Sequence, residues 1–289
     1  DGHLEFHQYI HSITNDWGDY VTNDDGYPIS HLIGLVSRLG KVLDAGIKPI
    51  YVFDGGFPEL KQELLDDRHE EKENAREVFQ QAVQNGNQSK AQAAAHKKNG
   101  VMDSMILSGM ELLEAMGVPA FRAPGEGEAQ AAQLCAEGTA SHVVTEDWDA
   151  LLHGVPSMLR DFGTSGCDKV GLQATLDELG WTHEELRWYG VLRGTDYNES
   201  VNGVGTTYGT SIIEDAESFD DVIAEAKTYD TVNEDRWRRA LELFDDQAVD
   251  EGLNPTWEPF DIERARKPVL RRVEWEIHDR SEERRVGKE

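Results

Sequence analysis

The stretch Lys48-Pro-Ile-Tyr-Val-Phe-Asp-Gly55 indicates the fold class of this chain of 289 residues. Its β-branched and aromatic residues predict a short buried strand. Residues 30–45, just before it, are predicted to form an amphipathic helix, because apolar side chains recur there at helical spacing and Gly46 supplies a stop. Asp54 places a carboxylate where the strand ends, so a polar site is expected at this edge of the sheet.

Helices and strands continue to alternate along the chain. Helices are predicted over 101–116 and from about residue 126, and strands over 118–122, 141–145 and 157–160. The second half is mostly helical, with segments at 173–179, at 183–192 and onward to 244, and with a glycine-containing turn at 203–209. Alternation of this kind favours an α/β fold with a central, mainly parallel sheet, whose ligands gather at the carboxyl ends of the strands.

Residues 58–100 differ from the rest in composition. Glu, Gln, Lys, Ala and Asn dominate them, and Asn85-Gly-Asn87 is a helix break. The apolar stripe is too thin for a core helix, so we predict an exposed helical hairpin.

The charge of the chain argues at first against a nucleic-acid partner. Fifty-six acidic residues oppose 28 basic ones, which gives a formal charge of -28 without a basic patch. The objection weakens in molar salt, where the Debye length falls to about 3 Å. A diffuse acidic surface also keeps a protein hydrated in brine, so we expect a halophilic source. Binding to nucleic acid would then depend on local phosphate contacts, stacking, shape and bound metal.

The remaining bulk features indicate a cytoplasmic protein. No apolar run approaches the roughly 20 residues that span a bilayer, and the first residues lack a secretion pattern. Cys135 and Cys167 are interpreted as reduced thiols, because they have no partner spacing for zinc or a disulfide framework. The chain begins at Asp1 without an initiator Met, so we expect a fragment that lacks an N-terminal strand.

Three further segments carry carboxylates in positions like that of Asp54. They contribute the pair Glu126 and Glu128, the pair Asp147 and Asp149, and the single residue Asp196. Residues two apart do not share a helix face, so the two glutamates can converge only if Glu126 lies in the entry turn of the helix. The two aspartates would point the same way if their backbone is extended.

Each of these acids alone is better interpreted as a solvated surface group. Their shared setting, after apolar strands or in glycine-bracketed turns, favours a cation site, because a buried unpaired charge is costly. Oxygen ligands without His or Cys clusters favour Mg²⁺, with Mn²⁺ as an alternative. Two such ions about 4 Å apart would stabilise both the attacking water and the leaving oxygen of a phosphodiester.

Five ordered motifs resemble those of the archaeal and eukaryotic flap endonucleases. The motifs are Ser30-His-Leu-Ile-Gly-Leu35, Ala45-Gly-Ile-Lys-Pro-Ile-Tyr-Val-Phe-Asp-Gly55, Ala123-Pro-Gly-Glu-Gly-Glu-Ala-Gln-Ala-Ala132, Thr145-Glu-Asp-Trp-Asp-Ala-Leu-Leu152 and Gly194-Thr-Asp-Tyr-Asn198. The resemblance implies a PIN-like 5′ nuclease fold with a helical arch and a C-terminal helical region that contains a helix-two-turn-helix motif. It also implies seven carboxylates around two Mg²⁺ ions, which fall here on Asp1, Asp54, Glu126, Glu128, Asp147, Asp149 and Asp196.

The same resemblance gives meaning to residues outside the carboxylates. Lys61 and Arg68 match two basic residues at the base of the arch, and a helix places residues seven apart within about 20° of each other. The alternative is a pair of solvated helix charges. Gly203 and Gly205 match a loop that grips the duplex backbone and binds K⁺ through carbonyls. His7 stands where the family often has an aromatic that stacks on DNA, and it can stack or pack.

Two departures qualify the resemblance. The basic residues expected after the loop are replaced by Thr206, Thr207 and Tyr208, which predicts a grip that is weaker or more dependent on K⁺. The sliding-clamp-binding peptide of the family is absent from the tail, although the clamp is an expected partner of the full-length protein.

We therefore expect an enzyme that cuts branched DNA at 5′ flaps, in Okazaki-fragment maturation and base excision repair, without any membrane association. It would act in the cytoplasm, at the nucleoid. The expected organisation is one integrated domain, with a nuclease region over 1–160 (arch at about 57–100) and an internal and C-terminal region over 161–289 (helix-two-turn-helix at about 190–225). The alternatives are a 5′→3′ exonuclease or junction-cutting relative with the same site, and a non-catalytic DNA-binding scaffold.

Overall fold

The computed structural model describes residues 1–56, 59–163 and 166–269. They form two compact units, which are considered separately. Unit 1 contains Asp1 and the segments Val52–Arg68 and Arg122–Asn254, and unit 2 contains the segments Gly2–Tyr51 and His69–Phe121 and the described residues from Pro255 to Val269. The chain crosses between the units in a pair of short strands, β1 (Tyr51–Phe53) and β2 (Ala120–Arg122).

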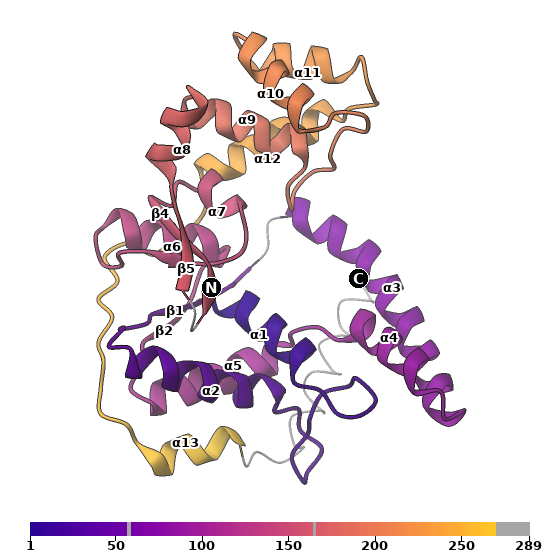
Figure 1. The fold of residues 1–289 in the computed structure, drawn as a ribbon, viewed down its shortest axis with the longest axis vertical. Helices are drawn as coiled ribbons and strands as arrows, with labels where there is room; N and C mark the ends of the chain where they lie inside the picture. The colour runs from indigo at the N-terminus through magenta and orange to yellow at the C-terminus, as the bar shows by residue number, and fades with distance from the viewer. Residues whose placement is uncertain (57–58, 164–165, 270–289) are drawn as a thin grey trace. The chain divides into compact units, whose positions relative to one another are not determined.

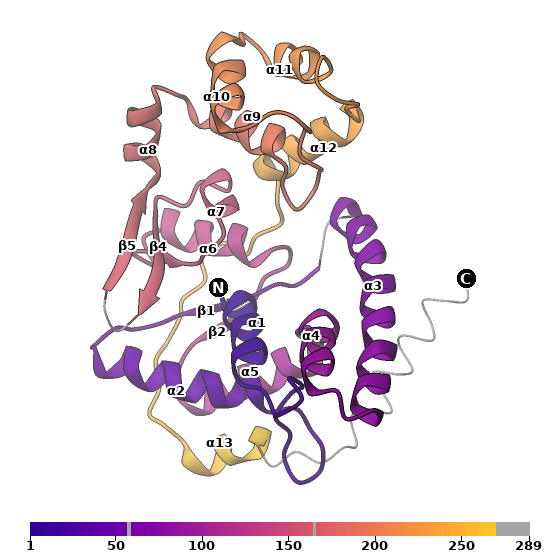
Figure 2. The same cartoon turned by 45° about the vertical axis from the view of Figure 1, so that its right-hand side comes forward.

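Unit 1 is built on a three-stranded sheet covered by helices (Figures 1 and 2). Its strands are β3 (Val143–Val144), β4 (Ser157–Gly163) and β5 (Gly166–Gly171), with β3 and β4 parallel and β4 and β5 antiparallel. Its helices are α6 (Gly127–Ala136), α7 (Asp149–Leu152), α8 (Leu172–Leu179), α9 (His183–Arg193), α10 (Thr206–Asp215), α11 (Phe219–Ala226) and α12 (Glu234–Asp245). One apolar cluster joins these helices to the sheet, and it includes Trp188, Trp237 and the fully buried Met158.

Local sequence explains where the helices of unit 1 begin. Thr182 and Glu185 form a capping box at the start of α9, and Ser218 and Asn233 accept hydrogen bonds from backbone N–H groups at the starts of α11 and α12. Gly180 ends α8 in the left-handed conformation that glycine adopts without strain.

Unit 2 is a helical layer with the arch hairpin beside it (Figures 1 and 2). Its helices are α1 (Gly2–Ser12), α2 (Ser30–Asp44), α4 (Gln88–Lys98), α5 (Asp103–Ala115), α13 (Ile262–Val269) and the larger part of α3 (Glu59–Gln84). Helix α2 packs against α1 and α5. Phe6, Leu35 and Leu113 are fully buried between them, and the buried His31 imidazole lies 2.9 Å from the Ser108 hydroxyl.

Most elements expected from the sequence are confirmed. The helix over 30–45 is α2, and the break at 85–87 separates α3 from α4. The strand that was expected over 48–53 covers only β1, and Pro49 lacks the N–H that a ladder needs. The turn expected over 203–209 ends at Gly205, because α10 begins at Thr206 and takes in Gly209.

Four elements were not anticipated, namely α1, α7, β5 and α13. Within residues 1–56, 59–163 and 166–269, no helix is long and apolar enough to cross a lipid bilayer.

Candidate active site

Six of the seven acids singled out from the sequence meet in one region of unit 1. Asp54 follows β1, Asp147 follows β3, and Asp196 follows α9. Glu126 and Glu128 stand at the start of α6, and Asp149 is the first residue of α7. Burial and electrostatic interactions, described below, show that these side chains share one neighbourhood.

Glycines allow the segments that carry Asp54 and Glu126 to approach closely. A Cβ on Gly55 would lie 1.8 Å from the carbonyl oxygen of Ala123, so only glycine fits there. The Gly127 N–H donates to Asp54 Oδ1 at 2.8 Å, and a Cβ on Gly127 would lie 3.0 Å from the same oxygen. Glu126 has extended backbone as the N-cap of α6, which confirms that it lies in the entry turn.

The backbone around Asp147 and Asp149 differs from the extended form expected. Trp148 is helical, with φ of -71° and ψ of -21°, and Asp149 begins α7. The Asp149 N–H donates to Asp147 Oδ1 at 2.9 Å, so a side-chain turn, and not an extended strand, fixes the two carboxylates. The expectation of extended backbone was therefore wrong, although both side chains still face the other acids.

The Lys61 ammonium lies among the carboxylates. Its Nζ atom is 2.5 Å from Glu126 Oε1 and 2.9 Å from Asp196 Oδ2. Burial alone would lower the pKa of Lys61, but the charges of Glu126 and Asp196 outweigh it and raise this pKa. The site therefore contains one permanent cation held by two of its acids.

Three acids of the site, Glu128, Asp147 and Asp149, hold their protons more tightly than free carboxyls do. Burial first, and then the charges of Asp54, Asp147 and Glu126, raise the pKa of Glu128 to about 8. Burial and the charges of Asp147, Asp196 and Glu126 raise the pKa of Asp149 to about 7. Burial also raises the pKa of Asp147. These directions show that the acids destabilise one another's charged forms, as expected of a group that needs cations.

The donor set fits a hard divalent cation. All six side chains offer carboxylate oxygens, the ligands that Mg²⁺ and Mn²⁺ prefer, and their mutual repulsion is what a divalent charge would offset. In the described part of the chain, however, no three Asp, Glu, His or Cys side chains already surround one point closely enough to hold an ion. Lys61 takes up oxygens of Glu126 and Asp196, so ion binding requires side-chain adjustment there.

The seventh acid, Asp1, also belongs to unit 1. Its terminal ammonium donates to the carbonyl of Val144, in β3, at 3.0 Å, three residues before Asp147. This contact places Asp1 at the end of β3, beside the strand that leads to Asp147 and Asp149.

Two groups that hydrogen-bond with Glu126, and one imidazole that lies near it, were missed from the sequence. The Tyr197 hydroxyl donates to Glu126 Oε2, Gln247 Nε2 lies 3.3 Å from the same oxygen, and the buried His153 imidazole lies 3.9 Å from it. Tyr197 lies in the motif that contains Asp196, and a position next to a proposed ligand was the available signal. Nothing in the sequence pointed to Gln247 or His153.

An exposed aromatic side chain, that of Trp148, lies between Asp147 and Asp149 in the sequence. Trp148 is 51% exposed, and the Arg160 guanidinium lies 4.2 Å from the centre of its ring. An exposed tryptophan beside a polar site is a surface on which a flat group can stack.

The remaining predicted residues are Arg68, His7, Gly203 and Gly205. The side chain of Arg68 lies outside the described residues, although its backbone belongs to α3. His7 lies in unit 2, on α1, with its Nε2 atom 3.3 Å from that of His11. Gly203 has a φ of +83°, and Gly205 is the N-cap of α10. The carbonyl between these glycines, that of Val204, accepts a hydrogen bond from the Arg193 guanidinium.

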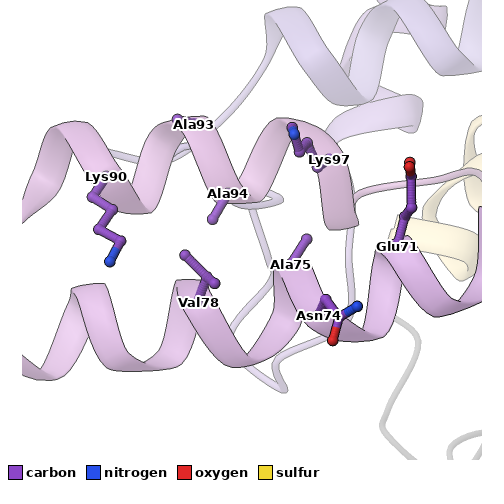
Figure 3. Close-up of a pocket in the computed structure, with 8 residues that line it drawn as sticks. All are labelled: Glu71, Asn74, Ala75, Val78, Lys90, Ala93, Ala94 and Lys97. Atoms are coloured by element: carbon purple, nitrogen blue, oxygen red, sulfur yellow. The ribbon is translucent and has the colours of Figure 1, made fainter.

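Helices α3 and α4 of the arch hairpin pack against each other through small side chains (Figure 3). Ala75 and Val78 of α3 face Ala94 of α4, and a groove of about 390 Å³ lies between the helices, with Lys90 at its side. The thin apolar stripe expected from the sequence therefore suffices for a hairpin, because alanines let the helices approach.

Comparisons with known proteins agree with this fold. A family model described as the XPG N-terminal domain matches residues 1–75, and one described as the XPG I-region matches residues 117–196. Flap endonuclease 1 of Methanoculleus marisnigri is 35% identical over 237 residues, which cover 78% of this chain and 71% of that protein. Flap endonuclease 1 of Methanosphaerula palustris is 34% identical, with 90% of this chain and 80% of that protein covered.

Solved structures show the same architecture. Flap endonuclease-1 from Methanococcus jannaschii, at 26% identity, has a TM-score of 0.66 over 93% of this chain and 89% of that one. The catalytic core of Rad2 in complex with DNA substrate, at 22% identity, has a TM-score of 0.69 over 97% of this chain and 89% of that one, a likeness of fold. The α/β 5′ nuclease fold expected from the sequence is confirmed. This chain, which matches both the XPG N-terminal and the XPG I-region models, belongs to the flap endonuclease family.

Proposed function

We propose that this chain is a structure-specific nuclease, which hydrolyses phosphodiester bonds where a single-stranded 5′ flap meets duplex DNA. The observation that carries the proposal is the gathering of Asp54, Glu128, Asp149 and Asp196 with Lys61 in one unit of a chain that belongs to the flap endonuclease family. We assign it to Okazaki-fragment maturation and base excision repair, the roles that the family resemblance implies.

The divalent ions of this site would be held by Asp1, Asp54, Glu126, Glu128, Asp147, Asp149 and Asp196. Two Mg²⁺ ions, with Mn²⁺ as a substitute, would supply charge compensation and a water of lowered pKa. Lys61 is assigned the task of placing a positive charge where the negative charge of a phosphodiester develops during hydrolysis. Arg68, seven residues further along α3, is assigned the same task. Tyr197 and Gln247 orient Glu126 by their hydrogen bonds.

Contacts with DNA would come from three places. The Gly203–Gly205 loop and the start of α10 offer backbone N–H groups to the phosphates of the duplex. Trp148 offers a stacking face, with the Arg160 cation beside it, next to the acids. His7 is proposed as a further stacking contact.

Arg193 contacts the Gly203–Gly205 loop, at which a K⁺ ion is expected. Its guanidinium already donates to the Val204 carbonyl, so one carbonyl of the loop has a permanent cationic partner. We propose that this contact makes the loop of this chain less dependent on K⁺ than a loop without such an arginine, which reverses the stronger K⁺ dependence expected from Thr206, Thr207 and Tyr208.

Substrate choice tests the proposal against its closest rival. Cleavage rates on a double flap, a nicked duplex and a four-way junction, measured with Mg²⁺, should be highest on the flap. Equal or faster cleavage of the nick or the junction would favour the exonuclease or junction-cutting alternative. Flap binding without cleavage of any substrate would favour the non-catalytic scaffold.

The charge of -28 supports a halophilic source. At molar salt, repulsion between the acidic surface and DNA is screened beyond the contact shell. Flap cleavage should therefore persist in molar KCl. An enzyme that is fastest in dilute buffer and inactive above physiological salt would contradict this proposal.

The wider organisation follows from the same assignment. The nuclease region over 1–160, with its arch at about 57–100, and the region over 161–289, with the helix-two-turn-helix at about 190–225, are proposed to act as one integrated domain. The protein would work on DNA at the nucleoid, with a sliding clamp as partner of the full-length form.

A further inference from the structure

Four histidines gather in unit 2, and none of them is one of the acids of the candidate active site. His3, His7 and His11 recur every four residues along α1, so they lie on one face of that helix. His96 comes from α4, which runs beside α1 in both views (Figures 1 and 2). The proposed function uses at most one of these imidazoles.

The rings of three of the histidines are in direct contact. His7 and His11 have ring centroids 4.4 Å apart, and the His96 ring stacks on His11, also at 4.4 Å. The Nε2 atoms of His7 and His11 are 3.3 Å apart. Two Zn–N bonds of about 2.05 Å at the tetrahedral angle separate their nitrogens by about 3.3 Å. The pair is therefore already at the spacing that one ion would impose.

We propose that His7 and His11, with His96 as a third ligand, bind one late first-row divalent ion of the Zn²⁺ class, and that this ion fastens α1 to the arch hairpin through α4. Imidazole nitrogens suit Zn²⁺, Cu²⁺ and Ni²⁺, in contrast to the carboxylates of the active site, which suit Mg²⁺. A pair of histidines four apart on a helix is a recurrent arrangement for zinc.

The protonation of the histidines supports this site. Burial, together with the charges of His7 and His96, lowers the pKa of His11 to about 4. Burial, then His3 and His96, and also the nearby Lys72, lower the pKa of His7. Both rings are therefore neutral at pH 7, the form that a metal ion needs, so binding does not have to displace a proton.

The site is open and incomplete as it stands. His7 and His96 are exposed, and His11 is half-buried. Among the side chains that the structure describes, no three are yet arranged around one point, and His96 stacks on His11 instead of converging with it. Recruiting His96 therefore requires a rotation of its side chain, and water would fill the remaining positions of the ion. Lys72 opposes a cation here, so we expect a weaker site than a closed structural zinc site.

Calorimetric titration of the full chain with Zn²⁺, in a large excess of Mg²⁺, tests this inference. The Mg²⁺ keeps oxygen-ligand sites occupied and competes poorly for imidazole. One Zn²⁺ should bind per chain. His7→Asn and His11→Asn should each weaken binding at least about tenfold, the loss that even an outer-shell substitution can cause. His96→Gln should weaken it by less.

The matched control is His142→Gln, because His142 is exposed and its Nδ1 atom shares a hydrogen bond with the Ser157 hydroxyl, outside the histidine cluster. It should bind Zn²⁺ like the wild type. Absence of Zn²⁺ binding by the wild type, or binding that survives both His7→Asn and His11→Asn, would overturn the site. Wild-type affinity in His96→Gln would overturn the third ligand.

A second measurement covers the case in which a variant does not fold. Long-range ¹H–¹⁵N NMR spectra of the wild-type imidazoles should show Zn²⁺-dependent shifts at the Nε2 atoms of His7 and His11. Unchanged resonances at a Zn²⁺ concentration that saturates the calorimetric signal would place the ion elsewhere. Neither measurement uses DNA, so failure of this inference and failure of the proposed nuclease function are separate results.

Discussion

Carboxylates in two regions of unit 1 behave in opposite ways. In the candidate active site, burial and neighbouring acids raise the pKa values of Glu128 and Asp149. In α11 and at the start of α12, the Ser218 hydroxyl lowers the pKa of the Asp221 carboxyl, and Lys227 lowers the pKa of Glu234. The residue type is the same, but the second region is solvated and supplied with hydrogen-bond donors.

The contrast separates two uses of the chain's 56 acidic residues. Solvated acids with their own donors are stable as anions and contribute to the hydrated, strongly negative surface. In the candidate active site, burial and neighbouring acids disfavour the anionic forms of Glu128 and Asp149, so further positive charge would stabilise those forms. Net charge alone cannot distinguish the two groups, and the predictions below test the distinction.

Loss of one acid from the site should have the largest effect. Asp149→Ala is expected to lower the flap-cleavage rate by about a thousandfold or more, in the range seen when a preorganised transition-state contact is removed. Flap binding should stay measurable, because a ligand of this kind acts on the transition state more than on docking. Single-turnover cleavage and fluorescence-anisotropy binding measure the two effects.

The matched control for this prediction is Asp177→Asn, an exposed acid on α8. It should cleave at the wild-type rate. Unchanged turnover of Asp149→Ala would remove Asp149 from the site and break the comparison.

Removal of the built-in cation should have the next largest effect. Lys61→Met is expected to slow cleavage by about a hundredfold. It should also tighten Mg²⁺ binding, because Glu126 and Asp196 lose the ammonium that now occupies their oxygens. Lys227→Met serves as the control, because Lys227 forms an ion pair with Glu234 at the surface. Slower cleavage with unchanged Mg²⁺ affinity would show that Lys61 does not compete with the ions.

When a chelator keeps divalent ions away, the two groups of acids should change the folding stability with pH in opposite directions. The folded pKa of Glu128, about 8, exceeds its unfolded value, so the folded state holds the extra proton, and stability falls as pH rises from about 4.5 through 8. The folded pKa of Asp221 is lowered, so its contribution is present above about pH 4 and is lost as pH falls further.

Denaturant unfolding across pH, with EDTA present, checks these signs. Glu128→Gln should flatten the loss of stability toward alkaline pH, and Asp221→Asn should reduce the loss toward acid pH. Mg²⁺ should restore stability at alkaline pH in the wild type. If both variants change the same limb of the profile, the distinction between the two groups is wrong.

The smallest effect is expected at the duplex loop. Cleavage by the wild type should change little when Na⁺ replaces K⁺, because Arg193 supports the Val204 carbonyl. Arg193→Gln should make the rate depend on K⁺. A wild-type rate that already requires K⁺ would contradict the role given to Arg193.

The sequence predicted the outline of the site better than its details. Asp54, Glu126 and Asp196 could be located because glycines and apolar segments mark the ends of strands and helices around them. The backbone of Asp147 and Asp149 could not, because a hydrogen bond between these two residues outweighed the extended conformation that the preceding strand favours.

Contacts between the site and residues far away in the sequence could not be predicted from the sequence. Gln247 reaches Glu126 from 121 positions away, and His153 reaches it through the packing of α7. The position of Lys61 between two acids also depends on tertiary structure, although its place on a helix was predicted. Local patterns fix where elements begin and end, and packing decides which polar side chains meet.

The most direct test of this account is a count of bound Mn²⁺ by electron paramagnetic resonance, in molar KCl to suppress weak binding to the acidic surface. The wild type and Asp177→Asn should each bind two ions that Mg²⁺ displaces, and Asp149→Asn should lose at least one of them. Identical titrations of Asp149→Asn and Asp177→Asn would contradict the claim that the gathered acids form a divalent-metal site.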